Sequence, residues 1–566
     1  MFVLFVAIAV FLLYPTLKPG SLHSTLPTGT TLTLTVPAFN AWTIWWNTDQ
    51  LQHGFREYWH APIFAPERGT FAFSEPQPIT MILAPLMWLT GSPALTYKVY
   101  VLLSLVMNGV LAVCLSRRLQ ARLVPAVLTG FCVVLLPIVH QQIDVMQLIP
   151  VWTIIWMWLA FDRLCIRPGA AAAVQAGVAF GLMFWTSVHH ALFASVLLCG
   201  PVVFLIRNVR NSRFWLSAGL ALGIAAMLIL PLLIPMKRFL HQHDFERSDE
   251  LIQALSAKPM DYLNAPRNSL LPGLHPEESS RALFPGWTKL SLALMGILTG
   301  ILRTRTRRLS LFLLVTGALA FALSLGVYLE AGTWNVWKIL AENVPGLGHV
   351  RSVFRFAYFC QLPIVLLGAV ALSRLWLIAH RFQHRILRAG AMLLVAGIGI
   401  LAGCETPPAR FVLVGVPTFQ ENADWLTFLR YRVRQDESIL CLPFADGLSV
   451  RELDATTRWM YLQTAHGRRM LNGYSGFFPP SWFALQRQLK SGRETTDGTV
   501  IVDQMRRANC RFLVVRPHEY DIDRLLSELR FLIRTRLVHS GPSGVNIYEV
   551  SFVDGDQSLK AEPASP

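Results

Sequence analysis

The chain has 566 residues, of which 53% are hydrophobic and only 15% are charged, and its mean hydropathy is +0.44. Soluble domains carry about a quarter charged residues, so this composition excludes a solvated globular protein and indicates an integral membrane protein. The formal net charge of +16 would suit a nucleic-acid-binding protein. However, the arginines stand in short clusters between apolar runs, as membrane topology requires, and no nucleic-acid partner is expected.

Eleven apolar segments are predicted to be transmembrane helices, each close to the ~20 residues that a bilayer requires. They lie at residues 2–17, 95–116, 122–140, 143–161, 170–187, 190–206, 214–235, 287–302, 309–328, 356–377 and 389–404. A cleaved signal peptide is the alternative for the first segment, but it lacks a basic leading region and a small-residue cleavage site. The predicted fold class is therefore a polytopic α-helical membrane bundle over residues 1–404.

The connections between these segments predict the orientation of the chain. Every second connection is short and rich in arginine. These basic connections hold Arg117, Arg118 and Arg122, then Arg163 and Arg167, then Arg207, Arg210 and Arg213, then Arg303, Arg305, Arg307 and Arg308, and finally Arg381, Arg385 and Arg388. By the positive-inside rule they face the cytoplasm, together with the N-terminus. Residues 18–94, 236–286 and 329–355, and the chain after Cys404, are then extracytoplasmic.

Residues 18–94 form a long first external loop, which ends in a further apolar stretch, ITMILAPLMWLTG. This stretch contains Pro85 and is too short to span comfortably, so we predict an interfacial helix at 79–91. A span at this position would instead place the basic cluster at Arg117 outside, in conflict with all later loops.

The chain changes character at about residue 405. Helical patterns such as ADWLTFLRYRV, VIVDQMRRAN and DIDRLLSELRFLI alternate with the β-rich runs SILCLPF, RFLVVR and GVNIYEV. This alternation predicts a small extracytoplasmic α/β domain at residues 405–552 with a partly parallel sheet, followed by a disordered tail at 553–566. Cys441 and Cys510 lie in two β-rich runs, and we prefer two reduced core cysteines over a disulfide between them.

The signatures of common enzymes are missing. The sequence has no GxxxxGK[ST], HExxH, GxSxG or paired CxxC, so ATP hydrolysis is not expected and no metal site is predicted. Ionisable residues are nearly absent from the predicted spans, whereas secondary transporters and proton pumps keep such residues at mid-membrane. A transport function is therefore the weaker hypothesis.

Chemistry-bearing residues concentrate in the first external loop. There Trp42, Trp45, Trp46, Tyr58 and Trp59 stand among Asp49, His53, Glu57, His60, Glu67 and Glu75. On a helix the three tryptophans from residues 42–46 and Asp49 share one face, which sets a carboxylate beside aromatic surface at the membrane boundary. An interfacial aromatic belt is the alternative explanation for the tryptophans, but it does not account for the carboxylates.

The order of these features resembles that of the GT-C glycosyltransferases: a first transmembrane helix, an external loop with carboxylates, an interfacial helix, a bundle and an external C-terminal domain. The segments that carry the resemblance are NAWTIWW, APIF, AFSEPQP, GLGHVRSVFRF (346–356) and NGYSGFFPP (472–480). They are similar to segments of bacterial multi-spanning proteins of this group. The resemblance covers nearly the whole chain and implies an integral protein of the bacterial inner membrane.

The resemblance implies a reaction. An acceptor, which is a lipid, a glycan or a protein, attacks a sugar carried on a polyprenyl phosphate; a first-loop carboxylate takes the acceptor's proton, and configuration inverts. Asp49 ranks first as this base, Glu75 second and Glu57 third. Many family members carry an acidic residue soon after the first helix, whereas residues 18–40 contain none. A degenerate membrane scaffold and a non-enzymatic lipid or polysaccharide transporter are therefore kept as alternatives.

The reaction also needs cations to stabilise the leaving phosphate. Arg351 and Arg355 are the first candidates because a helix would present both at the outer end of the 356–377 span; anchoring by snorkelling is the alternative. His189 and His190, in a predicted tight turn between two spans, are further phosphate candidates. The other residues expected in the substrate cavity are Trp45, Trp46, His53 and Arg247. No cofactor is assigned, although a divalent cation is compatible with the reaction.

Overall fold

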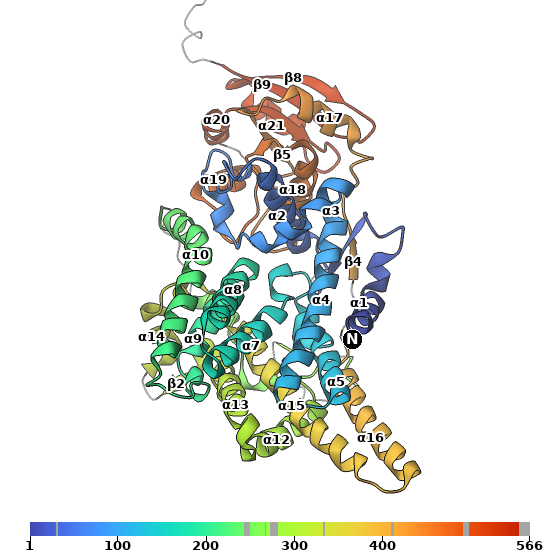
Figure 1. The fold of residues 1–566 in the computed structure, drawn as a ribbon. Helices are drawn as coiled ribbons and strands as arrows, with labels where there is room; N and C mark the ends of the chain where they lie inside the picture. The colour runs from blue at the N-terminus through green and yellow to red at the C-terminus, as the bar shows by residue number, and fades with distance from the viewer. Residues whose placement is uncertain are drawn as a thin grey trace, which may run out of the picture.

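The computed structural model describes residues 1–29, 32–242, 249–266, 268–271, 281–331, 334–408, 412–490 and 497–553. Figure 1 shows a bundle of helices with a sheet-containing part at one end of it. Except for its first residue, the tail predicted at 553–566 lies outside the described residues.

Every predicted span coincides with a helix, so the helical prediction is confirmed. The helices of the bundle are α1 (Phe2–Leu17), α4 (Pro93–Arg118), α5 (Leu123–Val134), α6 (Pro137–Gln141), α7 (Trp152–Ile166), α8 (Ala170–Thr186), α9 (Val188–Leu198), α10 (Ser212–Gln242), α12 (Trp287–Leu302), α13 (Thr304–Ser324), α15 (Ala357–His380) and α16 (Arg385–Cys404). Within the described residues, seven helical segments are long and apolar enough to cross a membrane. The count of about eleven spans stays a prediction.

Several spans differ from their predicted limits. The span predicted at 122–140 is divided into α5 and α6, and the span predicted at 143–161 is α-helical only from Trp152. The span predicted at 190–206 is helical only as α9, which ends at Leu198 because Gly200 and Pro201 follow and cannot continue a helix. The span predicted at 309–328 begins earlier, at Thr304, so the arginine-rich connection is itself helical. Arginine is a good helix former, and the basic side chains then lie on the first turns of α13.

Three short elements lie between α10 and α15, in the second and third long external segments. They are α11 (Asp249–Ala254), the two-stranded pair β2 (Glu330–Ala331) and β3 (Trp334–Asn335), and α14 (Val336–Asn343). The turn η8 (Val353–Phe356) then leads directly into α15.

The first external loop is more structured than predicted. It contains β1 (Thr25–Thr28), the long helix α2 (Thr35–Gln52) and the turn η1 (Thr70–Phe73). The interfacial helix predicted at 79–91 is a 3-10 turn, η2 (Pro78–Leu83), followed by α3 (Ala84–Thr90). Its apolar side chains Ile82 and Leu89 are 73% and 85% exposed, as expected of residues that contact lipid.

The C-terminal part is built around a five-stranded sheet. Its order is β6 (Arg469–Met470), β5 (Ser438–Leu442), β7 (Cys510–Val515), β9 (Asn546–Phe552) and β8 (Ile533–Ser540). β5 runs parallel to β6 and β7, whereas β9 is antiparallel to β7 and β8. The helices around it are α17 (Ala423–Arg432), α18 (Asp454–His466), α19 (Pro480–Leu489), α20 (Gly498–Arg507) and α21 (Ile522–Leu529). The three predicted β-rich runs and the partly parallel pairing are confirmed; β8, α18 and α19 were not predicted.

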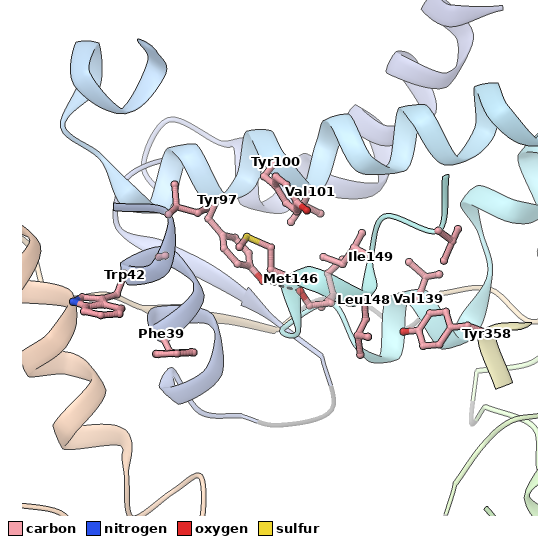
Figure 2. Close-up of a cluster of buried hydrophobic side chains, with 14 of the residues drawn as sticks. Phe39, Trp42, Tyr97, Tyr100, Val101, Val139, Met146, Leu148, Ile149 and Tyr358 are labelled. Carbon is pink, nitrogen blue, oxygen red and sulfur yellow. Dashed lines mark hydrogen bonds between the residues drawn. The ribbon is translucent and has the colours of Figure 1, made fainter. Parts of the chain in front are cut away.

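The first external loop and the C-terminal part pack as one unit. β1 pairs antiparallel with β4 (Val412–Gly415). The backbone of residues 62–65 pairs with residues 470–472, next to the edge strand β6. The Trp42 indole N–H donates to Gln463 Oε1 of α18 over 2.8 Å. Figure 2 shows the aromatic core beside this contact, with Phe39 and Trp42 on α2 and Tyr97 and Tyr100 on α4.

Cys441 and Cys510 are both free and buried. In the parallel pairing of β5 and β7, Cys510 lies opposite Ser438 while Cys441 lies opposite Val514. Three residues along a strand correspond to about 10 Å, beyond the reach of a disulfide. The register therefore supports two reduced core cysteines.

Candidate functional site

The structure divides the predicted site residues between two places. Glu75, His189 and Arg355 lie near one another where the first external loop meets the bundle. Asp49 and Glu57 border a separate cleft, which is described below. Arg247, predicted to line the substrate cavity, lies outside the described residues.

Glu75 is a buried carboxylate held at the start of a helix. The backbone N–H of Val188 donates to Glu75 Oε2 over 2.9 Å, and His189 Nδ1 bonds Oε1. Burial raises the pKa of Glu75, but His189, the Val188 amide and Arg355 together lower it below the ordinary value. The carboxylate is therefore ionised at neutral pH.

One polar face of α2 positions the segment that carries Glu75. Asn47 Nδ2 donates to the carbonyls of Pro76 (2.7 Å) and Gln77 (3.1 Å). Asn40 stands seven residues earlier, on the same face, and its Nδ2 donates to the backbone carbonyl of Asp144 over 2.8 Å. A single helix face thus holds together the segment after Glu75 and the segment that contains Asp144.

Asp144 is a site residue that the sequence analysis missed. It is 4% exposed, and its charge acts on Arg355, Tyr358 and Tyr474. The backbone at Gly29 lies close to the Asp144 side chain, because a Cβ added to Gly29 would stand 3.1 Å from Asp144 Oδ1. The signal was available, because Asp144 is an acidic residue inside a predicted span, and such residues are rare without a function.

The two arginines do not share an α-helical turn as predicted. Arg351 precedes the 3-10 turn η8, Arg355 lies within it, and α15 begins only at Ala357. Arg355 is half-buried, and its Nε has no hydrogen-bond partner within the described residues. The charge of Arg355 interacts with those of Arg351, Glu75 and Asp144, so this guanidinium lies within electrostatic range of two carboxylates and a second arginine.

The two helices around the predicted histidine turn are connected by a single residue, Ser187. Ser187 ends α8 and caps α9, and its Oγ accepts from the His190 N–H over 3.2 Å, so both histidines lie on the first turn of α9. His190 is 1% exposed, and neither of its ring nitrogens has a partner in the described part of the chain. Its ring lies 5.5 Å from that of Tyr358, which also appears in Figure 2.

The tryptophan face of α2 does form, and protein covers it. Trp42 is fully buried and stacks on Trp46 with ring centroids 6.4 Å apart, while Trp45 is 9% exposed. The face packs against α18 of the C-terminal part through Gln463. The aromatic side chains therefore belong to an interior packing surface, and their position relative to the membrane boundary stays a prediction.

Asp49 stands at the end of that face on a cleft of about 1220 Å³. His53 Nδ1 lies 3.3 Å from Asp49 Oδ2. Burial raises the pKa of Asp49, although His53 and Gln50 act in the opposite direction. Glu57 and Trp46 border the same cleft. Asn47 and Asp49 are two residues, or about 200°, apart around the helix, so Asp49 points away from the Glu75 segment.

No group of three or more His, Cys, Asp or Glu side chains that could hold a metal ion occurs within the ranges that the structure describes. The divalent cation considered from the sequence thus finds no ready set of ligands there.

Comparisons with known proteins identify the fold. No family model matches the sequence, and no curated protein does. Among solved structures, the arabinofuranosyltransferase AftD from mycobacteria aligns with 98% of this chain at 18% identity and a TM-score of 0.55. A mutant of the same enzyme gives a TM-score of 0.57 at 17% identity.

The chain has the GT-C fold. It spans about two fifths of the AftD chains, 40% and 42% of their lengths. ArnT from Cupriavidus metallidurans, solved with undecaprenyl phosphate, aligns over 99% of both chains at 14% identity and a TM-score of 0.49. At identities this low, the likeness to the AftD structures shows the fold alone, and the site residues must supply the argument for function.

Proposed function

We propose that this chain is a membrane glycosyltransferase that moves a sugar from a polyprenyl-phosphate donor to an extracytoplasmic acceptor, with inversion. One observation carries the proposal. Where the first loop of a GT-C fold meets the bundle, the charges of the buried carboxylates Glu75 and Asp144 both act on Arg355, whose Nε has no hydrogen-bond partner among the described residues.

The arginines would hold the lipid phosphate. A guanidinium presents planar N–H donors that match phosphate oxygens, and charge-assisted hydrogen bonds of this kind are strong. Arg355 lies in η8, directly before α15, and this helical segment is long and apolar enough to cross a membrane. A polyprenyl tail lying along such helices would deliver its phosphate to this end. Arg351 and His190 supply further donors to the leaving group.

Glu75 is the proposed base. The acceptor oxygen attacks the anomeric carbon, the bond from that carbon to the phosphate oxygen breaks, and the acceptor's proton passes to Glu75. In the free protein His189 and Arg355 hold the pKa of Glu75 low. A bound phosphate would offset the charge of Arg355 and raise the pKa of Glu75, so that the base gains proton affinity when the donor is present.

Two lysines of the bundle, Lys98 and Lys289, do not support the transport hypothesis. Lys98 lies near the start of α4 and donates to the carbonyls of Ser21 and Leu22. Lys289 lies near the start of α12 and donates to the carbonyl of Pro285. These lysines are bonded at helix ends and do not mark a polar path through the middle of the bundle.

The test is in vitro transfer from a panel of polyprenyl-phosphate sugars by the purified protein. We expect Glu75→Gln to lower turnover at least about 100-fold, since general-base catalysis contributes roughly 10²–10⁴. Asp144→Asn should also lower turnover, because it removes a charge that balances Arg355. Asp49→Asn should stay within about threefold of the wild type.

Glu421→Gln, at an exposed position of the C-terminal part, is the matched control for loss of a carboxylate. Normal turnover by Glu75→Gln together with loss of turnover in Asp49→Asn would show that Asp49, which the sequence analysis ranked first, is the base. Absence of transfer from every donor would favour the scaffold alternative.

A further inference from the structure

A second binding region lies between the first external loop and the C-terminal part. It is the cleft of about 1220 Å³ that Asp49 borders. Small-molecule pockets are commonly about 300–1,000 Å³, so this cleft has room for an extended ligand. One wall comes from residues 46–68 and the other from Arg430, Gln435 and residues 466–469.

The charged residues of the cleft are mixed, with arginine in excess. Five arginines border it: Arg56, Arg68, Arg430, Arg468 and Arg469. Three carboxylates do so: Asp49, Glu57 and Glu67.

Two of these carboxylates already have partners. Asp49 pairs with His53, and Glu67 Oε1 accepts from Ser481 over 2.7 Å. Arg468 is also engaged, because its guanidinium donates to the carbonyls of Leu429 and Arg430.

The other arginines of the cleft are available to a ligand. Within the described residues, Arg56, Arg68, Arg430 and Arg469 form no ion pair within 4.0 Å. Arg56 and Arg68 come from the loop, whereas Arg430 and Arg469 come from the opposite wall. A ligand in the cleft thus meets guanidinium groups from both sides.

The remaining groups indicate the ligand's chemistry. The amides of Gln52 and Gln435 each offer both donors and acceptors, as a surface rich in hydroxyls requires, whereas the Gln50 amide is buried and bonded to Asp49 and to the Glu57 N–H. The Trp46 ring borders the same space. The three carboxylates would repel the closely spaced phosphates of a nucleic acid. An anion with widely spaced charges can avoid this repulsion.

We infer that this cleft binds an acidic glycan, a chain of sugars that carries carboxylates at intervals. Its carboxylates pair with the free guanidinium groups and its hydroxyls bond the amides and carboxylates of the walls. The binding does not depend on catalysis. Only the role of this glycan as the acceptor rests on the proposed function.

The experiment measures binding by the purified full chain in detergent at 150 mM salt. The probes are a hexamer of galacturonic acid, a neutral maltohexaose and a single-stranded DNA oligonucleotide. We expect the acidic hexamer to bind at least about tenfold more tightly than either other probe.

Arg56→Gln, Arg68→Gln and Arg430→Gln should each raise the Kd for the acidic hexamer at least about threefold. Arg432→Gln is the matched control, because this arginine lies on the same helix as Arg430, is exposed and does not border the cleft. Thermal unfolding of each variant shows that it is folded.

Three outcomes would overturn the inference: equal binding of acidic and neutral hexamers, tighter binding of DNA, or an equal effect of Arg432→Gln. Failure of sugar transfer with intact glycan binding would refute the proposed function alone. Intact transfer without glycan binding would refute only the inference about the cleft.

Discussion

At the scale of single residues, burial separates groups that look alike in the sequence. Asp49 and Glu75 are both first-loop carboxylates, yet burial raises the pKa of one while neighbouring donors lower that of the other. His189 and His190 are adjacent, yet only His189 bonds a carboxylate. The roles of these side chains follow from their contacts and not from their types.

His466 gives a prediction at this scale. Burial, together with the charge of Arg468, lowers the pKa of His466 from 6.5 to about 3. The folded state therefore binds fewer protons than the unfolded state between these values, and stability falls as the pH drops below about 6.5. At about 1.4 kcal/mol per pH unit, the loss reaches about 2 kcal/mol at pH 5.

Thermal unfolding of the purified protein at pH 7.5 and pH 5 measures this effect. His466→Asn keeps an acceptor for the Arg468 N–H, which His466 Nδ1 now accepts over 3.0 Å, and should reduce the difference between the two pH values. His518→Asn, at a side chain that is 63% exposed, should leave it unchanged. An identical pH dependence in His466→Asn and the wild type would contradict the assignment.

At the scale of elements, α2 joins the two regions through its two faces. Its tryptophan face packs on α18, and its asparagine face bonds the segments next to Glu75 and Asp144. The Tyr58 hydroxyl also donates to Asn47 Oδ1 over 3.0 Å. A helix that is buried on both sides can transmit displacement of one region to the other.

Asn47→Ala tests this arrangement. The change removes the bond to the Pro76 carbonyl and leaves this buried acceptor without the Asn47 donor, which costs about 1–3 kcal/mol, whereas the Gln77 carbonyl keeps its bonds from Thr80. We expect a lower unfolding temperature and, because the Glu75 segment loses its support, a turnover reduced at least about tenfold. Leu51→Ala, at an exposed position of the same helix that does not border the cleft, is the control. Normal turnover in Asn47→Ala would show that the Glu75 segment is positioned by other contacts.

The elements also show how far the sequence could predict the structure. Apolar runs and β-rich runs located the bundle helices and three strands, because both signals are local. The tryptophans and Asp49 were placed correctly on one helix face. The surface that covers this face, and the bonds from Asn40 to the Asp144 segment, depend on residues about 100 to 400 positions away. The Asp49 and Glu75 carboxylates therefore could not be assigned to separate regions, whereas Asp144 was missed although its position inside a predicted span was a local signal.

At the scale of the whole molecule, arginines from different predicted cytoplasmic connections gather at one end of the bundle. A pocket of about 340 Å³ is bordered by Arg118, Arg207, Arg305 and Arg308. Asp162 also borders this pocket. Within the described chain, it is the only acidic residue that forms an ion pair with Arg118. Arg308 in addition donates to the carbonyl of Ile206. This clustering agrees with the prediction that these connections share one side of the membrane.

Labelling with a membrane-impermeant maleimide tests the orientation. Glu57→Cys and Gln383→Cys place a thiol at exposed positions of the first external loop and of the connection between α15 and α16. If the arginine-rich end is cytoplasmic, the reagent should label Glu57→Cys in intact spheroplasts. It should label Gln383→Cys only after the spheroplasts are lysed. The wild type, with its eight cysteines, gives the background. Labelling of Gln383→Cys in intact spheroplasts would show that the chain has the opposite orientation in the membrane. The Glu75 site and the acidic-glycan cleft would then face the cytoplasm, and an extracytoplasmic acceptor would be ruled out.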